Sequence, residues 1–120
     1  ELFFKKINIS FNQKYFDFII DDGSHKQNDI LLTLNLFFKS FKSNGFYIIE
    51  DYRLLNFFKH LRVPMEPSID KLIEYIRKKK NFNSSILNLE FQKELFKKVK
   101  LIKAYKGLKK YSNIVFLKKT

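Results

Sequence analysis

Two short runs of aromatic and β-branched residues, Tyr15–Ile20 and Phe46–Ile49, constrain the fold of this chain more than any other feature. Each run is nearly continuous in hydrophobicity, which is typical of a strand buried on both faces. A segment with helical spacing separates the runs, and a strand, a helix and a strand in that order form a unit with parallel strands and a right-handed crossover. The sequence therefore predicts an α/β fold built around a parallel pair of strands.

The segment between the two runs has the spacing of an amphipathic helix over residues 25–42. Ser24, followed three residues later by Gln27, matches a capping box, which predicts the start of the helix. Asn44-Gly45 predicts its end, because glycine is preferred just beyond a helix C-terminus. The apolar residues that repeat at helical spacing are Ile30, Leu31, Leu34, Phe37, Phe38 and Phe41.

The remaining sequence predicts the other elements of a single α/β domain of 120 residues. Residues 52–66 are expected to form an irregular loop, and Pro67–Lys79 a helix. Residues 86–96 are ambiguous, with a short helix as one interpretation. Val99–Tyr105 and Ser112–Leu117 flank a glycine- and lysine-containing turn, which predicts an antiparallel hairpin.

Charge is distributed very unevenly along the chain. The net charge is +12, and residues 77–120, whose only acids are Glu90 and Glu94, carry all of it. Such a basic half either binds a polyanion or forms a solvated, lysine-rich face. We favour the solvated face, because no aromatic-and-basic nucleic-acid motif accompanies the charge.

Composition excludes several classes of protein. The chain has no cysteine, which excludes disulfides and thiolate chemistry. No stretch approaches the roughly 20 apolar residues that a membrane-spanning helix needs, and the first residues lack the order of a secretory signal. We therefore expect a cytoplasmic protein that has no membrane partner.

Acidic pairs follow both predicted strands. Asp21 and Asp22 come directly after the first run, and Glu50 and Asp51 directly after the second. Parallel strands end at the same edge of a sheet, about 4.8 Å apart, and ligands of open α/β sheets bind at that edge. Four crowded carboxylates without cysteine favour a hard cation such as Mg²⁺ or Ca²⁺. His25, three residues beyond Asp22, is expected to reach the same place and to accept a proton.

A purely structural interpretation of these residues competes with the functional one. Aspartate and glycine after a strand are ordinary turn and cap residues, so one such acid alone would carry little information. Two acidic pairs and a histidine at one edge favour a functional site. His60 has no such neighbours in the sequence and is interpreted as a surface residue.

Two segments together resemble a known family. Phe16–His25 (Phe-Asp-Phe-Ile-Ile-Asp-Asp-Gly-Ser-His) and Asn44–Asp51 (Asn-Gly-Phe-Tyr-Ile-Ile-Glu-Asp) are similar to one branch of the class I S-adenosylmethionine-dependent methyltransferases. That branch contains the metal-dependent sugar O-methyltransferases of macrolide tailoring, of the macrocin and mycinamicin type, and the related cephalosporin hydroxylase group. The resemblance is close over residues 15–51 and extends to the remainder only in the order of the elements.

The resemblance implies a role for each residue of the acidic edge. Asp22, Glu50 and Asp51 match the metal ligands, His25 matches the general base, and Asp21 matches a position near the cofactor. The implied cofactors are S-adenosylmethionine and Mg²⁺ or a similar divalent cation. The implied fold is a Rossmann-like sheet whose parallel strands are followed by a C-terminal antiparallel hairpin.

The resemblance also implies the reaction and its partners. The expected activity is transfer of a methyl group from S-adenosylmethionine to a hydroxyl of a sugar or glycosylated small molecule. A metal lowers the pKa of a bound hydroxyl and a histidine accepts its proton, which suits an aliphatic alcohol. The expected partners are therefore a small-molecule or glycan acceptor and a second copy in a homo-oligomer, rather than nucleic acid.

One part of the family pattern is missing. The family binds S-adenosylmethionine mainly through a glycine-rich turn after its first strand, and none of Gly23, Gly45 and Gly107 forms a Gly-x-Gly turn. We therefore expect residues 1–120 to be the C-terminal portion of a single methyltransferase domain, without its cofactor-binding half, either as a fragment of a longer gene product or as a degenerate remnant. The alternatives are a non-enzymatic basic module that binds nucleic acid or another polyanion, and an inactive fragment.

Overall fold

The predicted strand–helix–strand unit is present in the computed structural model, which describes residues 16–119. Strands β1 (Phe16–Asp21) and β2 (Phe41–Glu50) run parallel. Helix α2 (Gln27–Phe37) connects them. Tyr15, the first residue of the predicted strand, lies outside the described residues.

A C-terminal hairpin completes a four-stranded mixed sheet. Strands β3 (Val99–Lys106) and β4 (Asn113–Lys119) pair antiparallel, as the sequence predicts. The sheet order is β1-β2-β4-β3, so β4 lies antiparallel between β2 and β3. The predicted fold class, an α/β fold with parallel strands and an antiparallel hairpin, is confirmed.

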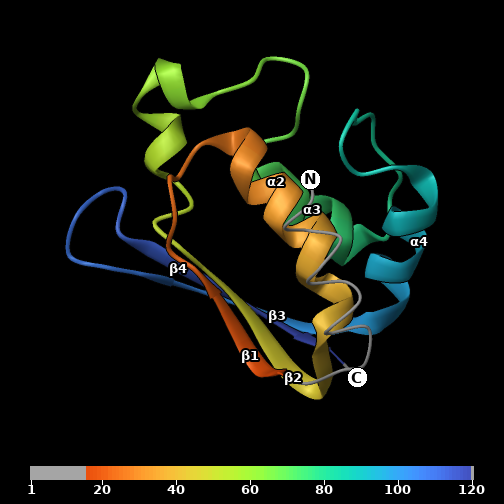
Figure 1. Ribbon diagram of the computed structural model, residues 1–120. Coiled ribbons are helices and arrows are strands. Elements are labelled where there is room, and N and C mark those ends of the chain that lie inside the picture. The colour runs from red at the N-terminus through yellow and green to blue at the C-terminus, as the bar shows by residue number, and fades with distance from the viewer. Residues whose placement is uncertain (1–15, 120) are drawn as a thin grey trace, which may run out of the picture.

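Three helices cover one face of this sheet (Figure 1). They are α2, α3 (Ile69–Lys78) and α4 (Leu89–Lys98); α4 resolves the ambiguous segment 86–96 as a helix. No helix in the described part of the chain is long and apolar enough to span a membrane. The core lies between the helices and the sheet and includes Ile30, Leu31, Leu34, Tyr47, Ile49, Leu72, Ile76, Leu95, Val115 and Leu117.

The prediction of a helix through residue 42 is wrong. Helix α2 ends at Phe37, and a 3₁₀ turn, Phe38–Ser40, leads directly into β2. Gly45 lies inside this strand, where an added Cβ would come within 2.5 Å of the carbonyl oxygen of Asp17 in β1. The glycine therefore permits close approach of two strands and does not terminate a helix.

The predicted capping box is also wrong. Ser24 does not cap α2, whose N-cap residue, Lys26, has no side-chain hydrogen bond. Gln27 is instead buried, and its amide nitrogen donates to the carbonyl oxygens of Glu66 and Pro67 at 2.7 and 2.6 Å. Its amide oxygen accepts a hydrogen bond from the Val63 N–H at 2.6 Å. Gln27 thus fixes the start of α2 to the loop that precedes α3.

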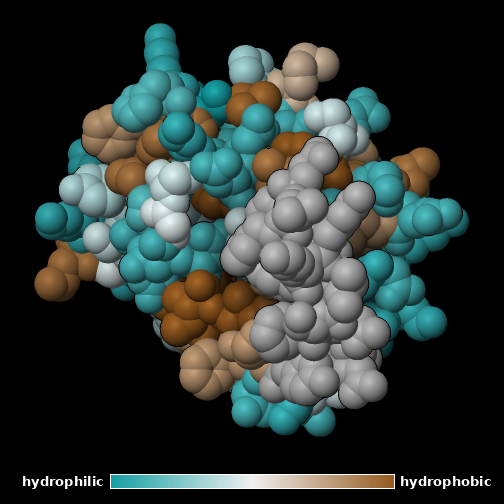
Figure 2. All heavy atoms as spheres, viewed as in Figure 1, coloured by the Kyte–Doolittle hydropathy of each residue, from teal (hydrophilic) through white to brown (hydrophobic). Residues whose placement is uncertain are grey.

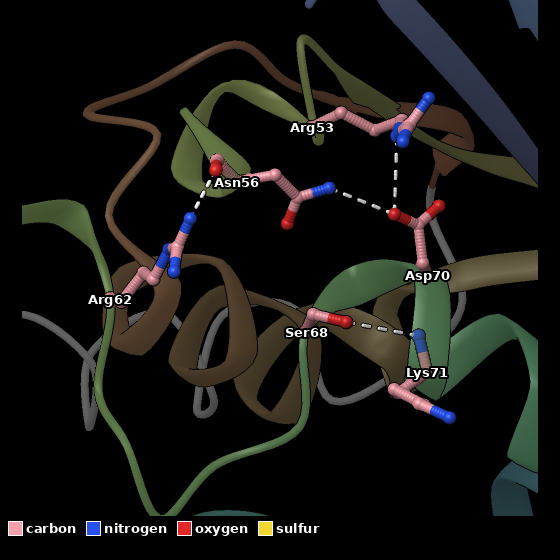
Figure 3. A network of polar contacts seen from close by, with 6 residues as sticks. All are labelled: Arg53, Asn56, Arg62, Ser68, Asp70 and Lys71. Carbon is pink, nitrogen blue, oxygen red and sulfur yellow. Dashed lines mark hydrogen bonds and ion pairs between the residues drawn. The ribbon is translucent and has the colours of Figure 1, made fainter. Parts of the chain in front are cut away.

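The segment predicted as an irregular loop, 52–66, contains two 3₁₀ turns, Leu54–Asn56 and Lys59–Leu61. Figure 3 shows how the first turn is tied to α3: Arg53 and Asn56 both donate to one carboxylate oxygen of Asp70, at 3.2 and 2.9 Å. His60, in the second turn, is exposed, as predicted. The segment is therefore held in place beside the carboxyl ends of β1 and β2.

Strand β1 is not buried on both faces, contrary to the sequence prediction. It is the edge strand of the described sheet. Phe18 and Ile20 are 59% and 52% exposed, because the described helices pack only on the opposite face. Figure 2 shows hydrophobic side chains gathered over this strand at the lower left.

Candidate metal and catalytic site

The carboxyl ends of β1 and β2 bring the predicted site residues to one place. Asp21 pairs with Ile49 in the parallel register, so Asp22 and Glu50 occupy neighbouring positions at the strand ends. Asp22, His25 and Asp51 each offer a ligand atom, and these three atoms lie within 4.8 Å of one another. The Nε2 atom of His25 is 3.6 Å from the Oδ1 atom of Asp22.

Glu50 joins this group through electrostatics. The pKa of its carboxyl is raised above the ordinary value by burial first, and then by charge repulsion and a hydrogen-bond contact with Asp22. Asp51 raises the pKa further, while His25 opposes the shift. A group in which carboxylates repel one another favours either a bound proton or a bound cation.

The turns that carry His25 and Asp51 have an uncommon backbone conformation. His25 has a φ of 62° and Asp51 a φ of 50°, in the left-handed region where L-residues are disfavoured. His25 therefore does not lie in the first turn of the helix, as predicted, but in the turn that precedes it. Such strain costs on the order of 1–3 kcal/mol per residue, and it clusters at functional sites.

Hydrogen bonds order the turn between β1 and α2. The Oδ1 atom of Asp21 accepts from the Gly23 N–H at 3.3 Å. The Ser24 hydroxyl accepts from the Lys26 N–H at 3.2 Å and donates to the carboxylate of Asp29. These local contacts hold the segment from which Asp22 and His25 project.

Asp21 shares a face of β1 with Ile19, which packs against the core, so it lies on the helix-covered side of the sheet. It pairs with the buried Ile49. Burial raises the pKa of its carboxyl, although the Gly23 amide and His25 oppose the shift. Within the described residues, the Oδ2 atom of Asp21 and the hydroxyl of Tyr47 are buried and have no hydrogen-bond partner.

The buried hydroxyl of Tyr47 near Asp21 could not be predicted from the sequence. The hydroxyl lies near enough to Asp21 for that carboxylate to add to the effect of burial in raising the tyrosine pKa. The period of two along β2 places Tyr47 on the same face as Ile49. Nothing in the residue pattern, however, marks its hydroxyl as unpaired beneath the acidic edge.

Comparison with known proteins gives a result only at the level of structure. No model of a protein family matches the sequence, and no curated protein matches it. A solved structure of MycE methyltransferase from the mycinamycin biosynthetic pathway, in complex with Mg and SAH, is similar at a TM-score of 0.62 and 17% identity. The likeness shows that this chain shares its fold with part of that protein.

A second MycE structure, in complex with Mg, SAH and mycinamycin VI, is similar at a TM-score of 0.64 and 20% identity. The two comparisons cover 98% of this chain but only 30% and 29% of the MycE chain. The chain therefore corresponds to less than a third of the length of these structures. In this fold the acidic edge lies where parallel strands present their carboxyl ends.

Proposed function

We propose that this chain is the metal-binding and proton-accepting part of an O-methyltransferase that acts on a hydroxyl of a sugar or glycosylated small molecule. The observation that carries this proposal is the meeting of Asp22, His25 and Asp51 within 4.8 Å at the carboxyl edge of the sheet. The methyltransferase fold supports it, because the similar MycE structures hold Mg, SAH and, in one case, mycinamycin VI.

The donor atoms at the acidic edge suit a hard divalent cation. Asp22 and Asp51 offer carboxylate oxygens in one place, and Glu50 stands beside them. Mg²⁺ is commonly bound by one or two carboxylates and keeps its other positions for water or substrate. We assign these three residues to the metal. When bound there, a divalent cation would lower the pKa of an acceptor hydroxyl.

We assign the proton-accepting role to His25. Its side chain is 20% exposed, so it is partly sheltered and still accessible to an acceptor at the sheet edge. Its Nε2 atom lies 3.6 Å from the Oδ1 atom of Asp22, so the ring stands beside the proposed metal ligands. In the proposed reaction S-adenosylmethionine, when bound, would supply the methyl group, and His25 would accept the proton of the acceptor hydroxyl.

Methyl transfer requires a cofactor pocket that this chain supplies only in small part. The sequence has no Gly-x-Gly turn, and Asp21 is the one residue we assign to the cofactor side of the edge. Strand β1 is an open edge in the described sheet. We propose that a cofactor-binding half completes the sheet along β1 and that residues 1–120 are the C-terminal portion of the resulting domain.

Metal binding by the chain itself tests the proposal. Mn²⁺ serves as a spectroscopic probe, and competition with Mg²⁺ follows. Asp51→Asn should weaken Mn²⁺ binding at least about tenfold, because the number of charged ligands sets the affinity of such a site. Asp17→Asn is the matched control, since it removes an exposed β1 carboxylate that pairs with Lys42. Equal losses in the two variants would show that no metal site exists at this edge.

A further inference from the structure

A basic pocket lies beside the acidic edge. It encloses about 360 Å³ between the first 3₁₀ turn after β2 and the loop of the β3–β4 hairpin. Its lining includes one arginine, three lysines, one aromatic residue and one amide: Arg53, Lys106, Lys109, Lys110, Phe57 and Asn113. From the sequence alone, the lysines of this region are expected to belong to a solvated face.

The sheet register places this pocket close to the acidic cluster. Ile114 pairs with Glu50, so Asn113, the preceding residue of β4, lies beside the turn that holds Asp51. Asn113 in turn pairs with Lys106 at the end of β3. With strands about 4.8 Å apart, the pocket begins one strand away from the cluster and ends two strands away, about 10 Å across the sheet edge.

The pocket carries positive charge that the described structure does not neutralise. Arg53 is paired with Asp70, with 3.2 Å between its Nε atom and a carboxylate oxygen. In contrast, no ion pair involves Lys106, Lys109 or Lys110 within the described residues. Lysines without an acidic partner that line one pocket give it a positive potential, which favours the binding of an anion there.

Phe57, which lines the pocket, belongs to a small group of aromatic rings beside these lysines. The ring centroid of Tyr111 lies 6.4 Å from that of Phe57 and 6.5 Å from that of Phe58. The ammonium group of Lys109 stands 5.9 Å from the centroid of the Tyr111 ring. Exposed aromatic faces next to fixed charges provide apolar contact for the carbon skeleton of a ligand whose anionic group meets the lysines.

We propose that this pocket binds the carboxylate or phosphate group of an anionic glycoside, while a hydroxyl of the same molecule reaches the acidic cluster. Arg53 and Asn113 would orient the ligand at the boundary between the two sites. The binding of the anion depends only on the pocket, whereas its role as a methyl acceptor rests on the proposed function. The pocket would thus select acceptors that carry one negative charge at a fixed distance from the reacting hydroxyl.

The same arrangement favours a small anion over a nucleic acid. A nucleic-acid backbone carries a continuous row of charges and needs an extended basic track. Here the basic pocket begins about one strand spacing from Glu50 and Asp51 and about two from Asp22. These carboxylates would repel further phosphates. A single carboxylate or phosphate avoids that repulsion.

Binding of three simple sugars tests the proposal. The probes are glucuronic acid, glucose 1-phosphate and glucose, titrated into the chain at low ionic strength. Both acids should bind at least about tenfold more tightly than glucose, and Lys109→Gln/Lys110→Gln should remove most of this difference. Glucuronic acid and glucose 1-phosphate distinguish a carboxylate from a phosphate preference. The matched control, Lys93→Gln/Lys97→Gln in α4, removes the same charge far from the pocket and should leave binding unchanged.

Three results would overturn the inference: no preference for the acids over glucose, equal losses in the two double variants, or tighter binding of a single-stranded oligonucleotide than of either acid. A parallel titration with Asp51→Asn separates this inference from the proposed function. If the acids still bind to Asp51→Asn and Mn²⁺ does not, both proposals stand. If the acids bind but the unaltered chain shows no Mn²⁺ site, the anion pocket stands without the proposed catalysis.

Discussion

His25 is the residue whose placement matters most for the chemistry. It has the left-handed φ of 62° in the turn between β1 and α2, and its ring lies beside Asp22 and Asp51. This position is compatible with two roles, a proton acceptor near a metal or a direct metal ligand. The two roles predict different effects of removing the imidazole ring.

In an active methyltransferase that contains this chain, we expect His25→Ala to lower the rate of methyl transfer by roughly 10²–10⁴, the usual contribution of a general base. The affinity for Mn²⁺ should stay within about twofold, because the assigned ligands are carboxylates. The measurements are single-turnover kinetics and a Mn²⁺ titration. A loss of metal affinity in parallel with the rate would make His25 a ligand, and near-normal turnover would remove it from the mechanism.

At the scale of elements, two side chains far apart in sequence hold the loops around the site. Gln27 fixes the start of α2 to residues 63–67. Glu66, from the same loop, is buried and accepts hydrogen bonds from the Ser84 hydroxyl and from the amide and hydroxyl of Ser85. These contacts connect the acidic turn, the loop before α3 and the segment before α4.

Glu66 should make the stability of the chain depend on acidic pH. Burial alone would raise the pKa of Glu66, but the hydrogen bonds from Ser84 and Ser85 outweigh it and hold this pKa below its ordinary value of 4.5. A lowered pKa in the folded state contributes stability above pH 4.5, and this contribution is lost as the pH falls through the folded-state pKa. Glu66→Gln should therefore reduce the free energy of unfolding at pH 7 by about 1–3 kcal/mol.

Urea denaturation of the unaltered chain and of Glu66→Gln, between pH 7 and pH 3, measures the contribution of the Glu66 charge to stability. The difference in unfolding free energy between them should shrink as the pH falls. Glu90→Gln, which alters an exposed carboxylate of α4, is the control and should change little. A difference that stays constant over this pH range would show that the Glu66 charge does not stabilise the fold.

The sequence predicted those elements whose signals are local. Acidic pairs follow the two apolar runs, Tyr15–Ile20 and Phe46–Ile49. Because parallel strands end at the same edge of a sheet, this pattern was enough to predict that Asp22 and Asp51 lie together. Local signals failed where a distant partner decides the outcome. Gln27 matches a capping box, but its actual partners lie 36 to 40 residues away. Gly45 matches the residue that ends a helix, but in the structure it is needed because the carbonyl oxygen of Asp17 leaves no room for a Cβ atom.

The same limit applies to the site. The turn after β1 sends Asp22 toward the cluster and leaves Asp21 on the buried side. The family resemblance gives the two acids different roles, but the residue pattern by itself does not separate them. The anion pocket depends on the insertion of β4 between β2 and β3, which places Asn113 beside the end of β2 and Lys106 one strand further along the edge. No spacing in the sequence indicates that order of strands.

At the scale of the whole molecule, the sheet of the described structure has no helix on one of its faces and no neighbouring strand beyond β1 at one of its edges. Phe18 and Ile20 of β1 are exposed, and β1 has a neighbour on only one side. Apolar strands at an open edge are templates for association. This arrangement agrees with the proposal that a cofactor-binding half pairs with β1.

We expect the 120-residue chain, expressed alone, to be poorly soluble and to show no measurable binding of S-adenosylmethionine. Ile20→Lys should increase the soluble monomer fraction, because it places a charge on the exposed face at the edge. Leu32→Lys, which changes a comparably exposed residue of α2, is the control and should have a smaller effect. Size-exclusion chromatography and calorimetric titration are the measurements. A monomeric unaltered chain that binds the cofactor at micromolar strength would contradict the need for a second half.

The position of β4 also has a consequence for how the chain is made. β4 is the last strand in sequence, yet it lies inside the sheet and provides the antiparallel neighbour of both β2 and β3. During synthesis, β2 therefore leaves the ribosome well before its neighbour exists, and the sheet can close only after Asn113–Lys119 has emerged. Closure of the sheet is therefore expected to wait for β4, with the apolar β2 edge exposed to chaperones until then.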